Sequence, residues 1–95
     1  MPAYIVFTRE KTRDQSELDT YAQKVRTTIG GHPLTARAMY GRHEVLEGPA
    51  VEGVVILEFP TFEEAKAWYD SPGYRDARKH RHLGSDYRAV IVQGV

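Results

Sequence analysis

The stretch from Val54 to Val95 constrains the fold of this chain most, because its predicted elements follow one another with almost no slack. Residues 54–59 (VVILEF) form the most apolar run in the chain and predict a central strand, which Pro60 ends. Thr61 and Glu64 follow as an S/T-x-x-E capping box, a pattern typical of a helix N-terminus. The apolar residues that come next recur with helical spacing, so a helix packed on the sheet is expected here.

A second helix is predicted directly after the first one. Ser71 supplies an N-cap, and Pro72 occupies the first helical position, where its missing N–H costs nothing. Gly84 is expected to end this helix, and residues 87–93 (YRAVIVQ) then predict the last strand. The C-terminal part of the chain therefore predicts the order strand, helix, helix, strand.

The N-terminal part supplies a strand and a longer helix. Residues 3–8 (AYIVFT) are rich in β-forming residues and too few for a helix, which predicts a strand. Helical periodicity then extends over residues 14–30. Asp14 followed by Glu17 resembles a capping box at the start of this helix, and the glycine pair 30–31 can adopt the left-handed conformation that ends it.

A further strand is predicted over residues 34–40 (LTARAMY), in which apolar side chains alternate with longer or polar ones. Gly41 and Arg42 break the alternation, and residues 43–47 (HEVLE) can continue the strand beyond a bulge. The resulting order, β-α-β-β-α-β, is that of the ferredoxin-like α+β fold, a four-stranded antiparallel sheet with its helices on one face. Residues 1–95 are expected to form a single domain.

The sheet predicted in this way needs a cover on its second face. The first, third and last strands are apolar on both faces, and a strand of this kind is normally covered on both. The chain has no spare element for that purpose, and its 95 residues include no cysteine that could staple a small domain. A symmetric homodimer, with the two sheets packed face to face, is the economical solution.

The composition of the chain excludes several classes of function. Thirteen basic residues balance thirteen acidic ones, whereas proteins that bind nucleic acid usually carry a basic excess. The N-terminus lacks the basic start and long apolar core of a secretion signal, and no segment approaches the roughly 20 apolar residues of a membrane span. We therefore expect a cytoplasmic protein with no nucleic-acid partner and no membrane contact.

Four segments carry a family resemblance. They are GG at residues 30–31, VLEG at 45–48, LEFPTFEEAKAWYDSPGYRDARKHR at 57–81 and VIVQG at 90–94. Essentially the whole chain resembles the domain-of-unknown-function 1330 family (DUF1330), and the run EFP-x-x-E-x-A-x-AWYDSP-x-Y is its most specific part. Gly73 is one departure, because glutamate is expected there, and it loosens the start of the second C-terminal helix.

The resemblance implies a dimeric α/β-barrel, in which two ferredoxin-like sheets form a common barrel. It also implies kinship with small cofactor-less monooxygenases, muconolactone isomerases and chlorite-dismutase-like proteins, which share this barrel. Because a shared fold does not transfer activity, the function has to be argued from individual residues.

Glu58 is the candidate catalytic residue. It shares the parity of Val54 and Ile56 on an apolar strand, where a carboxylate is costly unless it is paired or hydrated. A carboxylate in such a place often has a raised pKa and can act as an acid or a base. The structural alternative, which we favour, is an ion pair or a hydrogen bond at the strand end.

Two arginines are candidates for binding an anion. Arg81 lies on an otherwise apolar helical stripe and is expected to point inward, where its guanidinium can anchor a carboxylate. Arg37 lies on the second strand, where solvent exposure on an edge is the favoured state. Either arginine could instead pair with Glu58 or with a carboxylate across the dimer.

Tyr4, Trp68 and Tyr74 are the remaining candidate ligand-binding residues. Trp68 and Tyr74 cluster with Tyr69 at the junction of the two C-terminal helices, and together with Tyr4 they could wall a pocket for a planar ligand. An aromatic stripe at helical spacing is more often part of the core, so the structural interpretation stays open.

No metal site and no cofactor are expected. His80 and His82 are two residues apart, which on a helix places them on nearly opposite sides, and no cysteine or suitably spaced glutamate completes a ligand set. The basic run KHRH at residues 79–82 is better explained as a cationic helix C-terminus that complements the helix dipole. Glycine-rich phosphate loops and recognisable nucleophile motifs are also missing from the sequence.

Two functions of different classes follow from these observations. The first is the binding of a small organic molecule in a cleft between sheet and helices, with Glu58 as acid or base, as in a cofactor-independent isomerase or oxygenase. The second is a non-catalytic homodimeric interaction or regulatory module, in which every one of these residues is structural.

Overall fold

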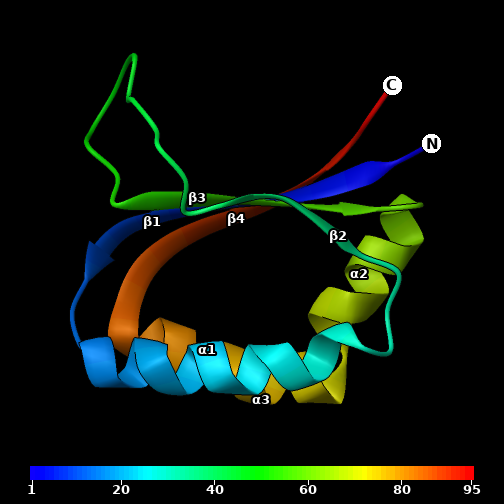
Figure 1. The fold of residues 1–95 in the computed structure, drawn as a ribbon, viewed down its shortest axis with the longest axis horizontal. Helices are drawn as coiled ribbons and strands as arrows, with labels where there is room; N and C mark the ends of the chain where they lie inside the picture. Colours follow the sequence, from blue (N-terminus) through cyan, green and yellow to red (C-terminus); the bar gives the residue numbers. More distant parts are fainter.

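The computed structural model describes residues 1–95 as a four-stranded antiparallel sheet with three helices on one face (Figure 1). The elements in chain order are β1 (Ala3–Thr12), α1 (Gln15–Ile29), β2 (Thr35–Met39), β3 (Gly53–Phe59), α2 (Phe62–Asp70), α3 (Pro72–Gly84) and β4 (Ser85–Gln93). The strand order in the sheet is β2-β3-β1-β4, and every neighbouring pair is antiparallel. The predicted ferredoxin-like α+β fold is thereby confirmed.

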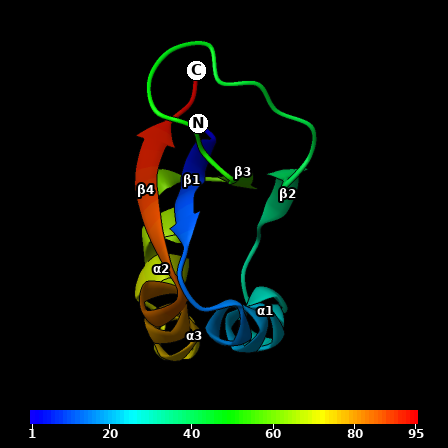
Figure 2. The same ribbon diagram turned by 90° about the vertical axis from the view of Figure 1, so that its left-hand side faces the viewer.

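The helices form a second layer that is spaced from the sheet. Helices α1 and α3 lie side by side beneath the strands, and α2 descends from the sheet to that layer (Figures 1 and 2). Helix α1 packs along α3, and its backbone lies close to that of the strands at very few positions. None of the three helices combines the length and the apolar character that crossing a bilayer demands.

The hydrophobic core fills the space between the two layers. Alternate side chains of β1 and β3 point into this layer, as the period of two along a strand requires. The residues buried there from the sheet are Ala3, Ile5, Phe7, Val55, Leu57 and Phe59, and those from the helices are Leu18, Ala65, Trp68, Tyr74 and Ala77.

The opposite face of the sheet is apolar as well and carries no element of this chain. Register places Tyr4 between Glu58 and Val92, and Val6 between Ile56 and Val90. Val90 and Val92 are 56% and 48% exposed. The expectation that the strands are apolar on both faces therefore holds for the central pair and for β4, and in the protomer one of these faces meets water.

The two predicted helix starts in the C-terminal part are confirmed at atomic detail. Thr61 Oγ1 accepts the N–H of Glu64 at 3.1 Å, which caps α2. Ser71 Oγ accepts the N–H of Tyr74 at 3.3 Å and caps α3, with Pro72 in its first turn. Both caps depend only on neighbouring residues, which is why the sequence pattern located them.

The ends of α1 differ from the prediction. Asp14 is the N-cap, but its carboxylate accepts from the N–H of Ser16, and Glu17 turns away to His80 on α3. Gly30 ends the helix in the right-handed region, with φ of −63°, so the predicted left-handed cap does not form. The capping-box pattern covers only neighbouring residues, so it could not indicate that Glu17 contacts His80 on another helix.

Residues 43–47 do not continue β2, which corrects the prediction for that segment. The strand ends at Met39, and Tyr40 adopts a positive φ of 55°, which turns the chain out of the sheet. The following loop projects beyond the sheet on the side away from the helices (Figure 1). Strand β1 is longer than predicted and runs to Thr12, with a bulge in its pairing to β4 between Arg9 and Lys11.

Candidate functional site

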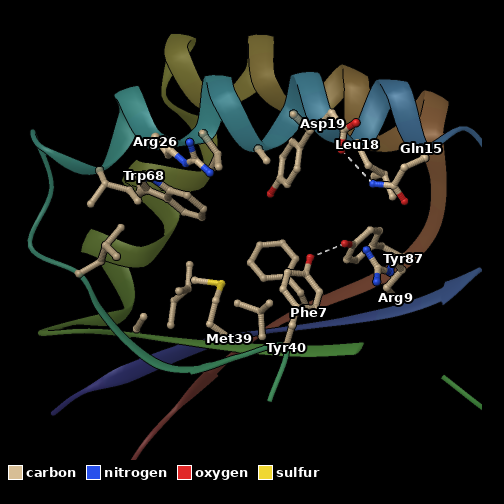
Figure 3. Close-up of a pocket in the computed structure, with 18 residues that line it drawn as sticks. Phe7, Arg9, Gln15, Leu18, Asp19, Arg26, Met39, Tyr40, Trp68 and Tyr87 are labelled. Atoms are coloured by element: carbon tan, nitrogen blue, oxygen red, sulfur yellow. Dashed lines mark hydrogen bonds between the residues drawn. The ribbon is translucent and has the colours of Figure 1, made fainter. Parts of the chain in front are cut away.

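The candidate site is a cavity of about 460 Å³ between α1 and the sheet. Most of the residues that line it are apolar, and they come from α1, from β1 to β4, from the chain around β2 and from α2. Figure 3 shows Trp68 reaching in from α2, with Phe7 and Met39 rising from the strands towards α1. Its volume and its mostly apolar lining are those of a site for a small organic ligand.

The cavity exists because α1 rests on α3 and not on the sheet. Lys24 Nζ contacts the Asp76 carboxylate at 2.7 Å, and Glu17 contacts His80 Nδ1 at 2.7 Å, so an ion pair and a hydrogen bond link α1 to α3. The hydroxyls of Tyr21 and Tyr74 lie 2.9 Å apart and add a third link between these helices. A helix held from the side in this way leaves space above it that side chains do not fill.

Trp68 forms one wall of the cavity and is only 1% exposed. Its indole N–H donates to Thr28 Oγ1 at 3.2 Å, and the Thr28 hydroxyl donates in turn to the Val25 carbonyl at 2.7 Å. Its ring stacks at a tilt on Tyr74, with the centroids 4.0 Å apart. Because both polar atoms of this contact are satisfied, the ring is fixed in position against the cavity.

A pair of hydroxyl groups forms the deep polar contact of the cavity region. Tyr21 lines the cavity, and its hydroxyl shares a hydrogen bond with that of Tyr74. Burial is the main cause that raises the pKa of Tyr21 and of Tyr74 above the ordinary value of 10.0. Both phenols are therefore neutral at physiological pH and can donate or accept a hydrogen bond without carrying charge.

A second pair of phenols lies where the cavity meets the surface. The hydroxyls of Tyr40 and Tyr87 are 2.5 Å apart, and the guanidinium of Arg9 lies 5.0 Å from the ring centroid of Tyr40 (Figure 3). Burial raises the pKa of Tyr87 as well. Tyr40 is 44% exposed and packs its ring over Gly53, where a Cβ would approach the ring to 2.5 Å.

Tyr21, Tyr40 and Tyr87 are site residues that the sequence pattern did not indicate. Tyr21 has the periodicity of a buried helical residue, and nothing local distinguishes it from the rest of its stripe. Tyr40 and Tyr87 are 47 positions apart in the chain, so only the folded sheet brings their hydroxyls together. The Tyr40 ring also needs a glycine at position 53 to pack against, and no sequence motif indicates this.

The predicted ligand-binding residues on the helices fall near this cavity. Trp68 lines it directly, and Tyr74 lies behind Tyr21. Arg81 points inward, as expected, and is only 2% exposed. Its guanidinium carbon lies 5.2 Å from the ring centroid of Phe7 and 5.0 Å from that of Tyr87, so it sits directly behind two side chains of the cavity wall.

Tyr4 and Glu58 lie on the opposite face of the sheet, which corrects the expectation of a single cleft for all five residues. The two residues are paired across β1 and β3, on the parity of Val6 and Ile56. Glu58 Oε1 accepts from Arg37 Nε at 2.9 Å in a half-exposed ion pair. Because side chains alternate between faces along a strand, neither residue can reach the cavity.

The histidines of α3 do not gather ligands around them. His80 Nδ1 contacts the Glu17 carboxylate, and the lowered pKa of His82 follows from burial and from the positive charge of Arg81. No group of three or more His, Cys, Asp and Glu side chains in the structure has the arrangement to hold a metal ion.

Solved structures share this fold across nearly the whole chain. The chain is similar to RPA0582, a protein of unknown function from Rhodopseudomonas palustris, with a TM-score of 0.77 and 18% identity over 99% of this chain and 82% of that one. A dimeric ferredoxin-like protein of unknown function from Thermobifida fusca gives a TM-score of 0.64 and 14% identity, covering 97% of this chain and 90% of the other.

A third similar structure belongs to a protein with a described activity. It is SnoaB, a cofactor-independent oxygenase from Streptomyces nogalater, with a TM-score of 0.60 and 10% identity over 99% of this chain and 92% of that one. At these identities the likeness concerns the fold alone. No protein of curated function matches the chain.

A family model described as domain of unknown function (DUF1330) matches residues 2–95. The match spans every strand and helix, including both halves of the cavity wall and the capped α2–α3 segment whose residues carried the resemblance. The chain belongs to the DUF1330 family.

Proposed function

We propose that this protein binds a small, planar and mostly apolar organic molecule in the cavity between α1 and the sheet. The observation that carries the proposal is the cavity itself, about 460 Å³ in volume and lined mainly by apolar side chains. Aromatic side chains in the lining favour a planar ligand, and two pairs of phenols offer the few polar contacts that orient it.

The proposal extends to catalysis without a cofactor, of the isomerase or oxygenase kind. Neutral phenols held by hydrogen bonds are preorganised donors, and such donors stabilise negative charge that develops on a substrate oxygen. SnoaB, which has a similar fold, is a cofactor-independent oxygenase. In this proposal the phenols of Tyr21 and Tyr87 act on the substrate, and Glu58 belongs to the other face of the sheet.

We also propose that the protein is a homodimer whose two sheets pack through their free faces. Two of the similar structures are described as dimeric ferredoxin-like proteins, and the free face here is apolar over three strands. Burial of such a face removes apolar area from water, which is the main favourable contribution to association. A homodimer that serves only for interaction or regulation is the alternative function, and it would use the same face.

Fluorescence of Trp68 tests the binding proposal, because Trp68 is the only tryptophan of the chain and lines the cavity. We expect naphthalene to change this fluorescence saturably and to raise the melting temperature, since a ligand that binds only the folded state stabilises it. Ala22→Phe places a ring inside the cavity and should abolish both effects. Gln23→Phe adds the same ring to the exposed neighbouring position and should leave both effects intact.

The two candidate functions give opposite results in this experiment. Saturable binding that Ala22→Phe removes and Gln23→Phe preserves supports a ligand site. No binding of naphthalene or of other planar apolar probes to the wild-type protein contradicts it and favours the non-catalytic module.

A further inference from the structure

Arg81 is a buried cation for which the protein supplies no anionic partner. The residue is 2% exposed, and its Nε atom is buried without a hydrogen-bond acceptor. Its side chain takes part in none of the ion pairs of the structure. Removing a guanidinium from water without a partner is costly, so a group in this state calls for an explanation.

The nearby carboxylates are already engaged elsewhere. Glu17 binds His80, and Asp19 accepts from the Gln15 amide at 3.0 Å (Figure 3). Glu52 accepts from Thr12 and pairs with Arg9, one of the two arginines that line the cavity, and the other, Arg26, is exposed on α1. None of these carboxylates forms an ion pair with Arg81.

The tyrosines around Arg81 do not provide the missing negative charge either. Tyr21, Tyr74 and Tyr87 have pKa values raised mainly by burial, and the charge of Arg81 offsets only part of that effect at Tyr21 and Tyr74. These phenols therefore stay neutral. The aromatic faces of Phe7 and Tyr87 compensate the cation partly, since both centroids lie within the roughly 6 Å at which cation–π attraction acts.

The position of Arg81 directs its positive potential into the cavity. Phe7 and Tyr87 stand between the guanidinium and the cavity, and both line it. Aromatic rings and apolar side chains screen a charge far less than water does, so a unit charge still acts strongly on a molecule on the other side of one ring. Arg81 thus adds a positive contribution to the potential in a cavity whose lining is mostly apolar.

We propose that the ligand itself supplies the missing negative charge, and that the site selects planar molecules carrying one acidic phenol or enol oxygen, bound as the anion. A delocalised oxyanion fits this environment better than a carboxylate, because the lining offers neutral phenol donors, while its two arginines are either paired with a carboxylate (Arg9 with Glu52) or exposed to water (Arg26). The inference rests on the proposed binding function and names its ligand class. Arg81 does not contact the ligand in this proposal. It is a positioning residue whose positive charge acts on the ligand's oxyanion through the aromatic rings of the cavity wall.

A pair of probes that differ in one hydroxyl group tests this inference. Para-nitrophenol absorbs at different wavelengths as phenol and as phenolate, so its bound pKa can be measured directly, and nitrobenzene has the same ring and nitro group without the acid. We expect the pKa of bound para-nitrophenol to fall by about one unit, which corresponds to about tenfold tighter binding of the phenolate than of the phenol. Nitrobenzene should bind more weakly than the phenolate.

Variants separate the charge of Arg81 from its packing. Arg81→Met keeps a long apolar side chain and should return the bound pKa to its value in water, while the thermal stability stays equal or rises because an unpaired buried cation is removed. Arg81→Lys should keep most of the shift. Arg75→Met removes an exposed positive charge from the same helix and is the matched control, for which the shift should persist.

The outcomes distinguish this inference from the proposed function. If neither nitrobenzene nor naphthalene binds to the wild-type protein, the binding function itself fails. If nitrobenzene binds as tightly as the phenolate, or if the bound pKa equals that in water, the cavity binds ligands but the inference is overturned. An unchanged shift in folded Arg81→Met would overturn it as well, because another group would then hold the charge.

Discussion

Tyr40 combines a strained backbone with a close side-chain contact. Its φ of 55° lies in the left-handed region that non-glycine residues seldom adopt, and its ring covers Gly53 so closely that a Cβ there would meet the ring at 2.5 Å. The hydroxyl at the far end of the ring holds Tyr87. The strain is thus balanced by packing and by one hydrogen bond at the edge of the cavity.

Gly53→Ala should push the Tyr40 ring away and break its hydrogen bond to Tyr87, at a cost of about 1 kcal/mol in the free energy of unfolding. In a Tyr40→Ala background the same substitution should be neutral or stabilising, because alanine loses less conformational freedom in a strand than glycine. Urea denaturation of the four proteins in this double-mutant cycle gives the coupling energy. Equal costs in both backgrounds would show that the two residues do not interact.

The buried phenols predict a loss of stability in alkaline solution. Burial raises the pKa of Tyr21 and Tyr87 above the ordinary value of 10.0, so these groups ionise in the unfolded chain before they ionise in the folded one. Their contribution to stability is complete below about pH 10 and is lost as the pH rises through that value towards the raised pKa values. Urea midpoints measured from neutral pH to about pH 11 check this sign.

The control for this prediction removes the ionisable groups. A Tyr21→Phe, Tyr87→Phe double variant should lose less of its own neutral-pH stability at high pH than the wild-type protein does. The same fractional decline in both proteins would assign the alkaline sensitivity to other groups.

At the scale of elements, the Ser71 hydroxyl links the end of α2 to the start of α3, beside the backbone bond from Ser71 N–H to the Trp68 carbonyl. Ser71 Oγ accepts from the N–H of Tyr74 and donates to the Trp68 carbonyl at 2.8 Å, so it ends one helix and begins the next. Trp68 and Tyr74 are also the stacked pair beside the cavity. The capping residue therefore sets the angle at which the two aromatic side chains meet.

Ser71→Ala should cost about 1 to 2 kcal/mol in the free energy of unfolding, because it removes an N-cap and a hydrogen bond to a partly buried carbonyl. Ser71→Asp should recover a part of this loss, since a carboxylate accepts from the helix N–H but cannot donate to the Trp68 carbonyl. Thermal or urea unfolding of the three proteins decides the order. A variant with aspartate that is no more stable than the one with alanine would show that the cap is unimportant.

At the scale of the whole molecule, the protomer leaves one apolar face of the sheet uncovered. It runs across β3, β1 and β4. Two ion pairs border it: Arg37 of β2 with Glu58 of β3, and Arg88 of β4 with Glu10 of β1. An apolar centre with charged residues around it is the usual composition of a protein interface.

Val90→Lys should convert the proposed homodimer into a monomer, because it places a charge on the apolar free face, where Val90 of β4 lies beside Val6 and is 56% exposed in the protomer. Leu83→Lys is the matched control, since Leu83 is 61% exposed on α3 away from the sheet. Analytical ultracentrifugation should find the control dimeric and the Val90→Lys protein monomeric and folded. A monomeric wild-type protein, or a Val90→Lys protein that remains dimeric, would contradict the proposed interface.

The sequence by itself determined those features that depend on near neighbours. The caps at Thr61 and Ser71 join groups three residues apart, and the alternation along β1 and β3 follows from a period of two. The order of elements then restricted the topology to the ferredoxin-like arrangement, and the inward position of Arg81 followed from the stripe on which it lies.

Only the tertiary structure decided which groups share a site. The alternation placed Glu58 with Val54 and Ile56 but did not say which parity faces the helices, and packing of α2 and α3 assigned the other parity to the core. The phenols of Tyr40 and Tyr87 meet although β2 and β4 are the two edge strands, because the Tyr40 ring extends from the end of β2 over Gly53 of β3 and beside Arg9 of β1. A cavity forms where two elements do not pack directly on each other. Here the separation between α1 and the sheet is set by contacts between α1 and α3, whose residues are far apart in the sequence.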